Sequence, residues 1–184
     1  MQSIITGSKV ILRKKRLADV YNDYDWEIDT ELAQLDAAPL ETVSFPQYLL
    51  EYTYKLRNSS PSGRRFAVDT LDGKHIGNCS YYNISNINNI SNINDEVELG
   101  IIIGNRDYWD KGCGTDAVTT LVNYIFRYTR FKRIHLKTLK SNSRAQRCFR
   151  KCGFTPCGHL DKDGFSFTLM EIRHQQWQEQ ESNG

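Results

Sequence analysis

The sequence predicts one domain of mixed α/β class, and three observations lead to this prediction. The chain has 184 residues, a length that favours one domain with a substantial core. Short apolar segments of strand length alternate with longer segments in which apolar residues recur at helical spacing. The apolar run 99–103 is followed by a glycine-rich segment and then by an amphipathic helix. We therefore expect a central sheet flanked by helices, with a right-handed strand–helix–strand crossover in its second half.

The first half of the chain predicts strands at its beginning and end, with helices between them. The dipeptide Asp72-Gly73 is typical of a hairpin turn between two strands. The basic run 13–16 is typical of a solvated strand end, with a phosphate contact as the alternative. The expected elements are a strand at 10–12, a helix over 17–26 that continues or breaks over 27–35, a helix from 45 to about 56, and strands at 65–70 and 75–84.

A short internal repeat follows this hairpin. The letters NISNIN occur twice between positions 83 and 94, and asparagine dominates the segment. The segment has little besides spaced isoleucines to bury, and it therefore predicts a hairpin tip or a flexible loop. Two copies are too few for a repeat fold.

The second half predicts strands that alternate with helices. Asn142 lies where a helix N-cap is expected, and Gly153 lies where that helix should end. The expected elements are a strand at 96–103, a helix over 115–130, a strand at 132–139, a helix ending near 152, and strands at 154–158 and 165–172. The polar chain after Trp177 is expected to fray. We place the domain at 1–178 and a polar tail at 179–184.

Composition and charge argue against several classes of function. The net charge of +2 gives no support to a nucleic-acid or membrane partner. No apolar run approaches the ~20 residues that span a bilayer. The first 16 residues lack the ordered zones of a signal peptide, so we expect a cytoplasmic protein.

Five cysteines are present, and their odd number predicts reduced thiols. Cys148, Cys152, Cys157 and His159 cluster in the sequence, which raises the alternative of a zinc site. Their spacing is not that of a zinc knuckle, and two of the cysteines fall on the apolar stripe of a helix. We therefore expect buried structural cysteines and no metal.

The glycine-rich segment before the helix predicts an anion site. Gly112 and Gly114 let the backbone approach a ligand closely, and the free N–H groups of a first helical turn attract anions. The segment also fits the dinucleotide pattern GxGxxA, but eight residues separate it from the strand and no acidic residue follows the next strand. A P-loop is excluded because there is no GK followed by Ser or Thr. A turn without a ligand is the remaining alternative.

Two segments resemble a known family: WDKGCGTDA, and KRIHLKTLKSNSRAQRCFRKCGF. They closely resemble the GNAT superfamily of N-acetyltransferases, and in particular its RimJ/RimL-type branch of ribosomal-protein N-terminal and spermidine acetyltransferases. The similarity extends from VILRKKRLADVYNDYDWEID to FTLMEIRHQQW. It implies a mixed, mostly antiparallel sheet whose two central parallel strands splay apart. It also implies acetyl-CoA as cosubstrate and a primary amine as acceptor.

The resemblance assigns the residues that bind the coenzyme. The family loop begins with Gln or Arg, and Trp109 stands there instead. The loop amides would hold the pyrophosphate, the strand would pair with the pantetheine arm, and a backbone amide near Ile101 would polarise the thioester carbonyl. Asn142 matches a family Asn, with N-cap as its alternative role. The implied coenzyme-binding residues are Ile101, Ile102, Ile103, Trp109, Asp110, Lys111, Gly112, Cys113, Gly114, Thr115 and Asn142.

The implied reaction is direct attack of the amine on the thioester. Glu98 is the candidate base, because the family often keeps a carboxylate in this strand, and an ion-paired strand residue is its alternative role. Many relatives place a Tyr four residues before the Gly-Phe pair to protonate the leaving thiolate, and Phe149 replaces it here. The general acid is therefore unknown, with Tyr82 and Tyr108 as alternatives, or none is required.

The acceptor region is expected in the first helices and in the hairpin over 81–94. The first helices carry its charge. These are acidic through Asp25, Glu27, Asp29 and Glu31, which favours a cationic amine, with a solvated helix face as the alternative. A CoA-binding regulatory or scaffold module with little turnover is the second functional hypothesis, and a dinucleotide enzyme is a distant third. The sequence is also compatible with a homodimer.

Overall fold

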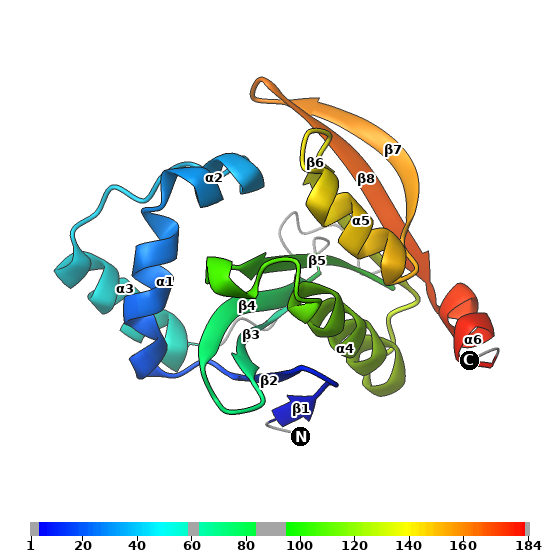
Figure 1. Cartoon of the computed structure of the whole chain (residues 1–184), viewed down its shortest axis with the longest axis horizontal. Helices are drawn as coiled ribbons and strands as arrows, with labels where there is room; N and C mark the ends of the chain where they lie inside the picture. The colour runs from blue at the N-terminus through cyan, green and yellow to red at the C-terminus, as the bar shows by residue number, and fades with distance from the viewer. Residues whose placement is uncertain (1–3, 59–62, 84–94, 183–184) are drawn as a thin grey trace.

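The fold is a single eight-stranded sheet with helices on both faces (Figure 1). This computed structural model describes residues 4–58, 63–83 and 95–182. The strands lie in the order β1-β2-β3-β4-β5-β6-β8-β7 and are antiparallel except for the β5–β6 pair. The strands are β1 (Ile4–Thr6), β2 (Val10–Lys14), β3 (Gly63–Thr70), β4 (His75–Tyr82), β5 (Glu96–Ile103), β6 (Arg133–Leu139), β7 (Thr155–Lys162) and β8 (Phe165–Arg173).

The helices divide between the two faces of the sheet. An apolar face of α4 packs on the strands, and together they form the main core with Leu121, Ile125 and Phe154 among its fully buried side chains. The opposite face carries the first three helices, which lie together on one side of Figure 1. The helices are α1 (Val20–Glu27), α2 (Thr30–Asp36), α3 (Phe45–Arg57), α4 (Cys113–Tyr128), α5 (Ser143–Lys151) and α6 (His174–Ser182). Within the described ranges, no helix has both the length and the apolar character needed to cross a membrane.

Polar side chains join the first three helices to the sheet. Asp23 of α1 forms an ion pair with Lys15 and accepts hydrogen bonds from Asn78 of β4 and from the Tyr52 hydroxyl of α3. Burial lowers the pKa of Lys15, although the charge of Asp23 opposes this effect. A buried polar network therefore fixes α1 and α3 on this face.

The structure confirms the expected class and differs from the predicted elements at three places. An additional strand, β1, pairs with β2 at the start of the described chain. The helical region after residue 26 breaks, which is one of the two expected alternatives, because the Asp29 side chain caps α2 by accepting hydrogen bonds from the amides of Glu31 and Leu32. Helix α4 begins at Cys113, two residues before its predicted start. The repeat at 84–94 lies outside the described residues.

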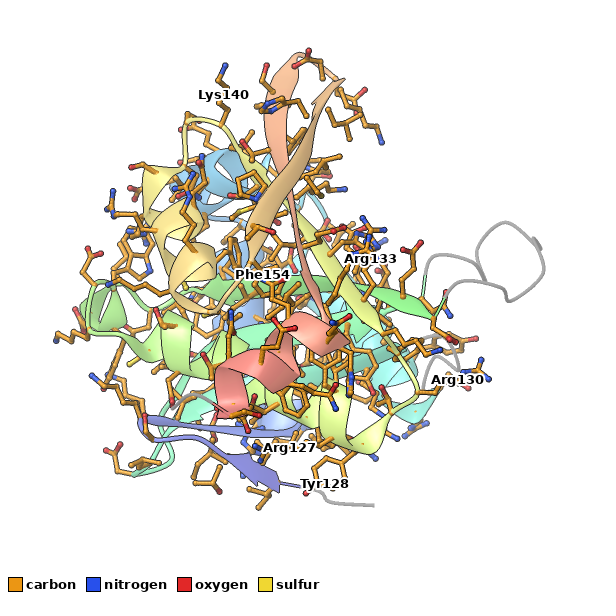
Figure 2. All side chains as sticks on the ribbon, turned by 90° about the vertical axis from the view of Figure 1, so that its right-hand side faces the viewer. Arg127, Tyr128, Arg130, Arg133, Lys140 and Phe154 are labelled. Carbon is orange, nitrogen blue, oxygen red and sulfur yellow. The ribbon has the colours of Figure 1, made fainter. Side chains whose placement is uncertain are left out.

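The third difference concerns the C-terminal end. The expectation that the chain frays after Trp177 is wrong up to Ser182, because these residues form α6. The Trp177 indole donates a hydrogen bond of 2.8 Å to the Asn123 side chain, and Arg127 forms an ion pair with Glu181. Figure 2 shows α6 lying over α4, with Arg127 beside it. These tertiary contacts order a segment that is polar in sequence.

Candidate active site

The two central strands separate, which leaves one edge of β5 open. The parallel register runs from Glu96↔Arg133 to Glu98↔His135 and then stops. On its other edge β5 stays paired with β4 as far as Gly77↔Ile103. In Figure 1, β6 leaves β5 and continues beside β8 and α5. The expected splay is therefore confirmed, and the strand edge over 99–103 is available to an extended ligand.

The chain turns sharply between this open edge and α4. The Trp109 indole donates a hydrogen bond of 2.6 Å to the carbonyl oxygen of Ile103, which ties the turn to the end of the strand. Asp110 and Gly112 adopt positive φ angles of 56° and 82°. Gly112 is the N-cap of α4, where this backbone conformation favours glycine.

The first turn of α4 presents unpaired amides. The first helical hydrogen bond runs from the Asp116 amide to the carbonyl of Gly112, at 2.9 Å. The amides of Cys113, Gly114 and Thr115 precede this bond and have no partner within the helix. A Cβ at Gly114 would meet only ordinary contacts, 3.6 Å from Ile103 Cγ1 and 3.8 Å from Cys148 Sγ. Internal packing does not explain the glycine, whereas close approach of an anion does.

The turn between β1 and β2 supports this loop, and no local sequence signal predicts this support. Lys9 Nζ donates a hydrogen bond of 2.9 Å to the carbonyl oxygen of Lys111. The Asp116 carboxylate accepts from the Ser8 hydroxyl and from the amides of Ser8, Lys9 and Val10. Burial alone would raise the pKa of Asp116, but these hydrogen bonds lower it. Asp116 therefore holds the first strands against α4.

Two arginines contact the Trp109 ring. The guanidinium carbon of Arg144 lies 3.5 Å from the ring centroid, and that of Arg106 lies 5.5 Å away. Arg106 also pairs with Asp29 at 2.8 Å and with Glu31 at 2.7 Å. Arg106 thus engages two of the four acidic residues that the sequence argument named, and a role of this acidic region in attracting the acceptor stays a prediction.

Asn142 caps the N-terminus of α5, which is the alternative role expected from the sequence. Its side-chain oxygen accepts a hydrogen bond of 3.0 Å from the Ala145 amide, and its side-chain nitrogen donates to the carbonyl of Leu35 in α2. Both polar atoms of this side chain are already engaged within the protein. A contact of Asn142 with the coenzyme stays a prediction.

Glu98 lies where β5 and β6 begin to separate. Tyr82 is its register partner on β4 and His135 its partner on β6, so these side chains share one face of the sheet. Tyr82 lies beside Glu98, and burial together with the Glu98 carboxylate raises the pKa of Tyr82. Lys137 Nζ lies 3.8 Å from a carboxylate oxygen of Glu98, whose side chain is 13% exposed.

Glu96 shares the face of Glu98 but has a different environment. It forms an ion pair with Arg133, and Arg133 also pairs with Glu171 of β8 at 2.6 Å. Arg133 therefore neutralises Glu96. Of these two carboxylates of β5, Glu98 lies closer to the open strand edge.

Phe149 lies in the core and cannot donate a proton. Its side chain is 6% exposed and packs edge-to-face on Phe154, with ring centroids 6.0 Å apart. Tyr108 lies on the other side of the loop, with the ammonium groups of Lys74 and Lys111 over its ring. Of the tyrosines considered as proton donors, Tyr82 is the one in contact with Glu98.

Two further carboxylates, Glu27 and Asp36, interact with each other, and Asp36 also interacts with Tyr82. Glu27 and Asp36 form no ion pair or hydrogen bond through their side chains in the described part of the chain. Both reach solvent, yet surrounding protein and the charge of Glu27 raise the pKa of Asp36 to about 6. Surrounding protein, together with the charges of Asp23 and Glu41, likewise raises the pKa of Glu27. The sequence argument named Glu27 but missed Asp36, which only the placement of α2 brings near it.

The cysteines are reduced, and not all of them are buried. Cys79, Cys113 and Cys152 are buried as expected, whereas Cys148 is half-buried and Cys157 is exposed. The expectation of buried cysteines is wrong for these two. In the described ranges, no three His, Cys, Asp or Glu side chains gather closely enough to hold a metal ion.

Comparisons with known proteins agree with this architecture. The chain is 25% identical over 162 residues to an uncharacterized N-acetyltransferase, p20, from Bacillus licheniformis, covering 87% of this chain and 86% of the relative. Its fold is similar to that of a spermidine N-acetyltransferase from Vibrio cholerae solved with CoA and spermine, with a TM-score of 0.78 and 21% identity over 93% of this chain and 99% of the other. An acetyltransferase from Bacillus anthracis gives a TM-score of 0.76 at 15% identity, over 94% and 99% of the two chains.

The match that identifies the family covers most of the chain. The description of that family is "Acetyltransferase (GNAT) domain", and it matches residues 9–155. This range includes the splayed strands, the glycine loop and the start of α4. Together with this geometry, the match shows that the chain belongs to the GNAT family of acetyltransferases.

Proposed function

We propose that this protein transfers the acetyl group of acetyl-CoA to the primary amine of a cationic acceptor, by direct attack in a ternary complex. The observation that supports this most is the open edge of β5, which leads from Glu98 to the unpaired amides at the start of α4. A strand rises about 3.3 Å per residue, so Glu98 lies about 16 Å before Ile103. A long linear coenzyme with a diphosphate at one end suits this layout.

The coenzyme would be held mainly by backbone groups. The amides of Cys113, Gly114 and Thr115 would bind the pyrophosphate, with the helix dipole of α4 adding to the attraction. The peptide groups of 101–103 would pair with the pantetheine arm. The Ile103 carbonyl already accepts a hydrogen bond from Trp109, so the pairing would rest mostly on Ile101 and Ile102.

Glu98 would act as the general base. An alkylammonium has a pKa of roughly 10 and must lose a proton before its nitrogen can attack. In the reaction the amine nitrogen forms a bond to the thioester carbon, its proton passes to Glu98, and the thiolate of CoA leaves. The Tyr82 hydroxyl, which interacts with Glu98, would orient the carboxylate. No proton donor is needed at Phe149 if the thiolate leaves unprotonated, since a thiol pKa of about 8.5 permits this near neutral pH.

The acceptor is proposed to be cationic because three carboxylates, Glu27, Asp36 and Glu98, are connected by interactions with one another or through Tyr82. Glu27 raises the pKa of Asp36, and Asp36 in turn raises that of Tyr82, so these groups are close enough to interact. Spermine and kanamycin, which are bound in two structures of similar fold, are polycationic amines. Polyamines, aminoglycosides and protein N-termini therefore belong in the first panel of acceptors.

Release of free thiol from acetyl-CoA across an amine panel tests this proposal. We expect Glu98→Gln to lower kcat by about 100-fold or more, because general-base catalysis contributes on this scale. Its matched control is Glu96→Gln, two residues earlier on the same face, which should retain most of the activity. Comparable loss in both variants would contradict the role of Glu98. Tight binding of acetyl-CoA without turnover of any amine would favour a CoA-binding regulatory module.

A further inference from the structure

One amine of the chain itself lies beside Glu98. The Nζ atom of Lys137, on β6, is 3.8 Å from the Oε1 atom of Glu98, on β5. Glu98 is in register with His135, and Lys137 lies two residues further along β6, so the three side chains share one face of the sheet. The alternate residues of β6, Ile134 and Leu136, belong to the main core under α4. Lys137 and Glu98 therefore lie on the opposite face, which carries the first three helices.

The Lys137 side chain spans the gap between the two separating strands. The backbones of β5 and β6 are paired only as far as Glu98 and His135, yet the Lys137 ammonium still reaches the Glu98 carboxylate. The coenzyme of the proposed function follows the open edge of β5 from the glycine loop towards Glu98, so its acetyl end would enter the same gap. The Lys137 amine would then lie where an acceptor amine must lie in order to attack.

The ion pair with Glu98 holds Lys137 loosely. A distance of 3.8 Å is longer than a hydrogen bond, and the Lys137 side chain is 47% exposed. The charge of Lys137 also lowers the pKa of Asp36, so Lys137 interacts with a second carboxylate of this face. Because the ammonium sits on a long and flexible stem, rotations of the side chain can bring it to a bound thioester without a change in the backbone.

We propose that, when no acceptor is bound, the protein acetylates its own Lys137 with acetyl-CoA, an inference that rests on the proposed function. The Lys137 ammonium passes one proton to Glu98, and the electron pair freed on Nζ forms a bond to the carbonyl carbon of the thioester. The C–S bond breaks, and CoA leaves as a thiolate. The new amide nitrogen then loses its second proton to water. One acetyl-CoA is consumed for each acetylated lysine, and the lysine loses its positive charge.

Lys132 offers a matched comparison within the same chain. Its Nζ atom lies 3.5 Å from a carboxylate oxygen of Asp95, which is a similar ion pair, and its side chain is 77% exposed. It immediately precedes β6, at the end of the paired strands that is away from the open edge of β5. Uncatalysed transfer from acetyl-CoA should therefore favour the more exposed Lys132, whereas transfer within the site should favour Lys137.

Intact mass and peptide mapping test the modification. Protein incubated with acetyl-CoA and no added amine should gain the mass of one acetyl group. Trypsin does not cleave after an acetylated lysine, so the peptides 134–137 and 138–140 should be joined as 134–140. The rate per molecule should not depend on protein concentration, because each Lys137 lies in its own site. Lys137→Arg keeps the positive charge and should abolish the gain in mass. Faster acetylation of Lys132 than of Lys137, or a rate that rises with protein concentration, would overturn the proposal.

Two further measurements connect the modification to the site. Glu98→Gln should slow the acetylation of Lys137 by about 100-fold and leave that of Lys132 unchanged. An amine that the acceptor panel shows to be acetylated should, at saturating concentration, slow the acetylation of Lys137 several-fold, because both amines need the same thioester. An unchanged rate at Lys137 in either measurement would contradict the proposal.

The outcomes separate this proposal from the proposed function. If amines of the panel are acetylated and Lys137 is not, the acetylation of Lys137 is overturned and the proposed function stands. If Lys137 is acetylated in a way that depends on Glu98 but no amine of the panel is, the acetylation of Lys137 stands and the proposed class of acceptor is wrong. If neither Lys137 nor any amine is acetylated, both proposals are overturned.

Discussion

The two faces of the sheet are built by different means. The face under α4 is apolar, with side chains such as Leu121, Ile125 and Ile134 almost fully removed from water. The face under α1, α2 and α3 is joined to the helices by buried charges, among them Arg13 with Asp19 and Asp69. On the first face, backbone groups would bind the coenzyme. On the second face, side chains would bind the acceptor.

The difference suggests how the two substrates are recognised. A diphosphate can be bound by helix amides and glycine, which depend on the fold and tolerate changes in side chains. An amine acceptor must be selected by particular charges, and these come from segments far apart in the chain. Variation in the second face should therefore change the acceptor without disturbing the coenzyme.

The largest expected effect concerns the buried charges of the acceptor face. Arg13→Leu would leave Asp19 and Asp69 buried without their main partner, and we expect a loss of about 3–5 kcal/mol in the free energy of unfolding. Arg16→Leu is the matched control, because Arg16 contacts the same two carboxylates at 3.7 Å with a side chain that is 59% exposed. Its loss should stay below about 1 kcal/mol. Urea unfolding measures the free energy of unfolding of both variants. Equal losses would contradict the distinction between the buried Arg13 and the exposed Arg16.

A smaller effect is expected at the coenzyme face. Gly112→Ala places a Cβ on a residue with a φ of 82° and within 3.3 Å of Lys9 Nζ, so it should cost about 1–2 kcal/mol and weaken acetyl-CoA binding. Gly164→Ala is the control, because Gly164 has a φ of 79° with nothing within 4 Å of the added Cβ. It should show similar backbone strain with unchanged coenzyme affinity. Thermal unfolding and calorimetry separate the two, and loss of affinity in both variants would show that the effect is general.

The smallest effect is expected from Asp36→Asn. Because the pKa of Asp36 is raised to about 6, its carboxylate attracts a cation above this pH and not below it. The KM for a cationic acceptor should rise by up to about fivefold in the variant at pH 8, with the difference vanishing near pH 5. The exposed Asp25→Asn on α1 should show no such change. If the ratio of the KM of the variant to the KM of the parent protein does not change with pH, Asp36 is not part of the acceptor site.

The same raised pKa has a consequence for stability. The folded protein holds the proton of Asp36 more tightly than the unfolded chain, so the stabilisation present below the ordinary pKa is lost as the pH rises through about 6. The melting temperature of Asp36→Asn relative to the parent protein should therefore increase between pH 4 and pH 7. A constant difference would contradict this environment for the carboxyl group.

Sequence patterns determined the elements whose signals are local. The apolar stripe of α4, the Asn142 cap of α5 and the Asp72-Gly73 turn all appear where the sequence predicts them. Each depends on residues within a few positions of one another, so periodicity and capping chemistry suffice. The family also followed from short segments, because the glycine loop and the helix after β6 are compact motifs.

Only the tertiary structure decided which charges face the acceptor and which are already paired. Asp29 and Glu31 are engaged by Arg106, which is more than 70 positions away, while Asp36 has no side-chain hydrogen bond or ion pair among the residues that the structure describes and interacts with Glu27. The polar α6 is likewise ordered by Asn123 and Arg127 of another helix. Such contacts join residues distant in sequence, and no local propensity encodes them. The sequence by itself therefore determined the fold class and the coenzyme loop, whereas long-range electrostatics, set by the packing of α1, α2 and α3 on the sheet, decided the proposed acceptor site.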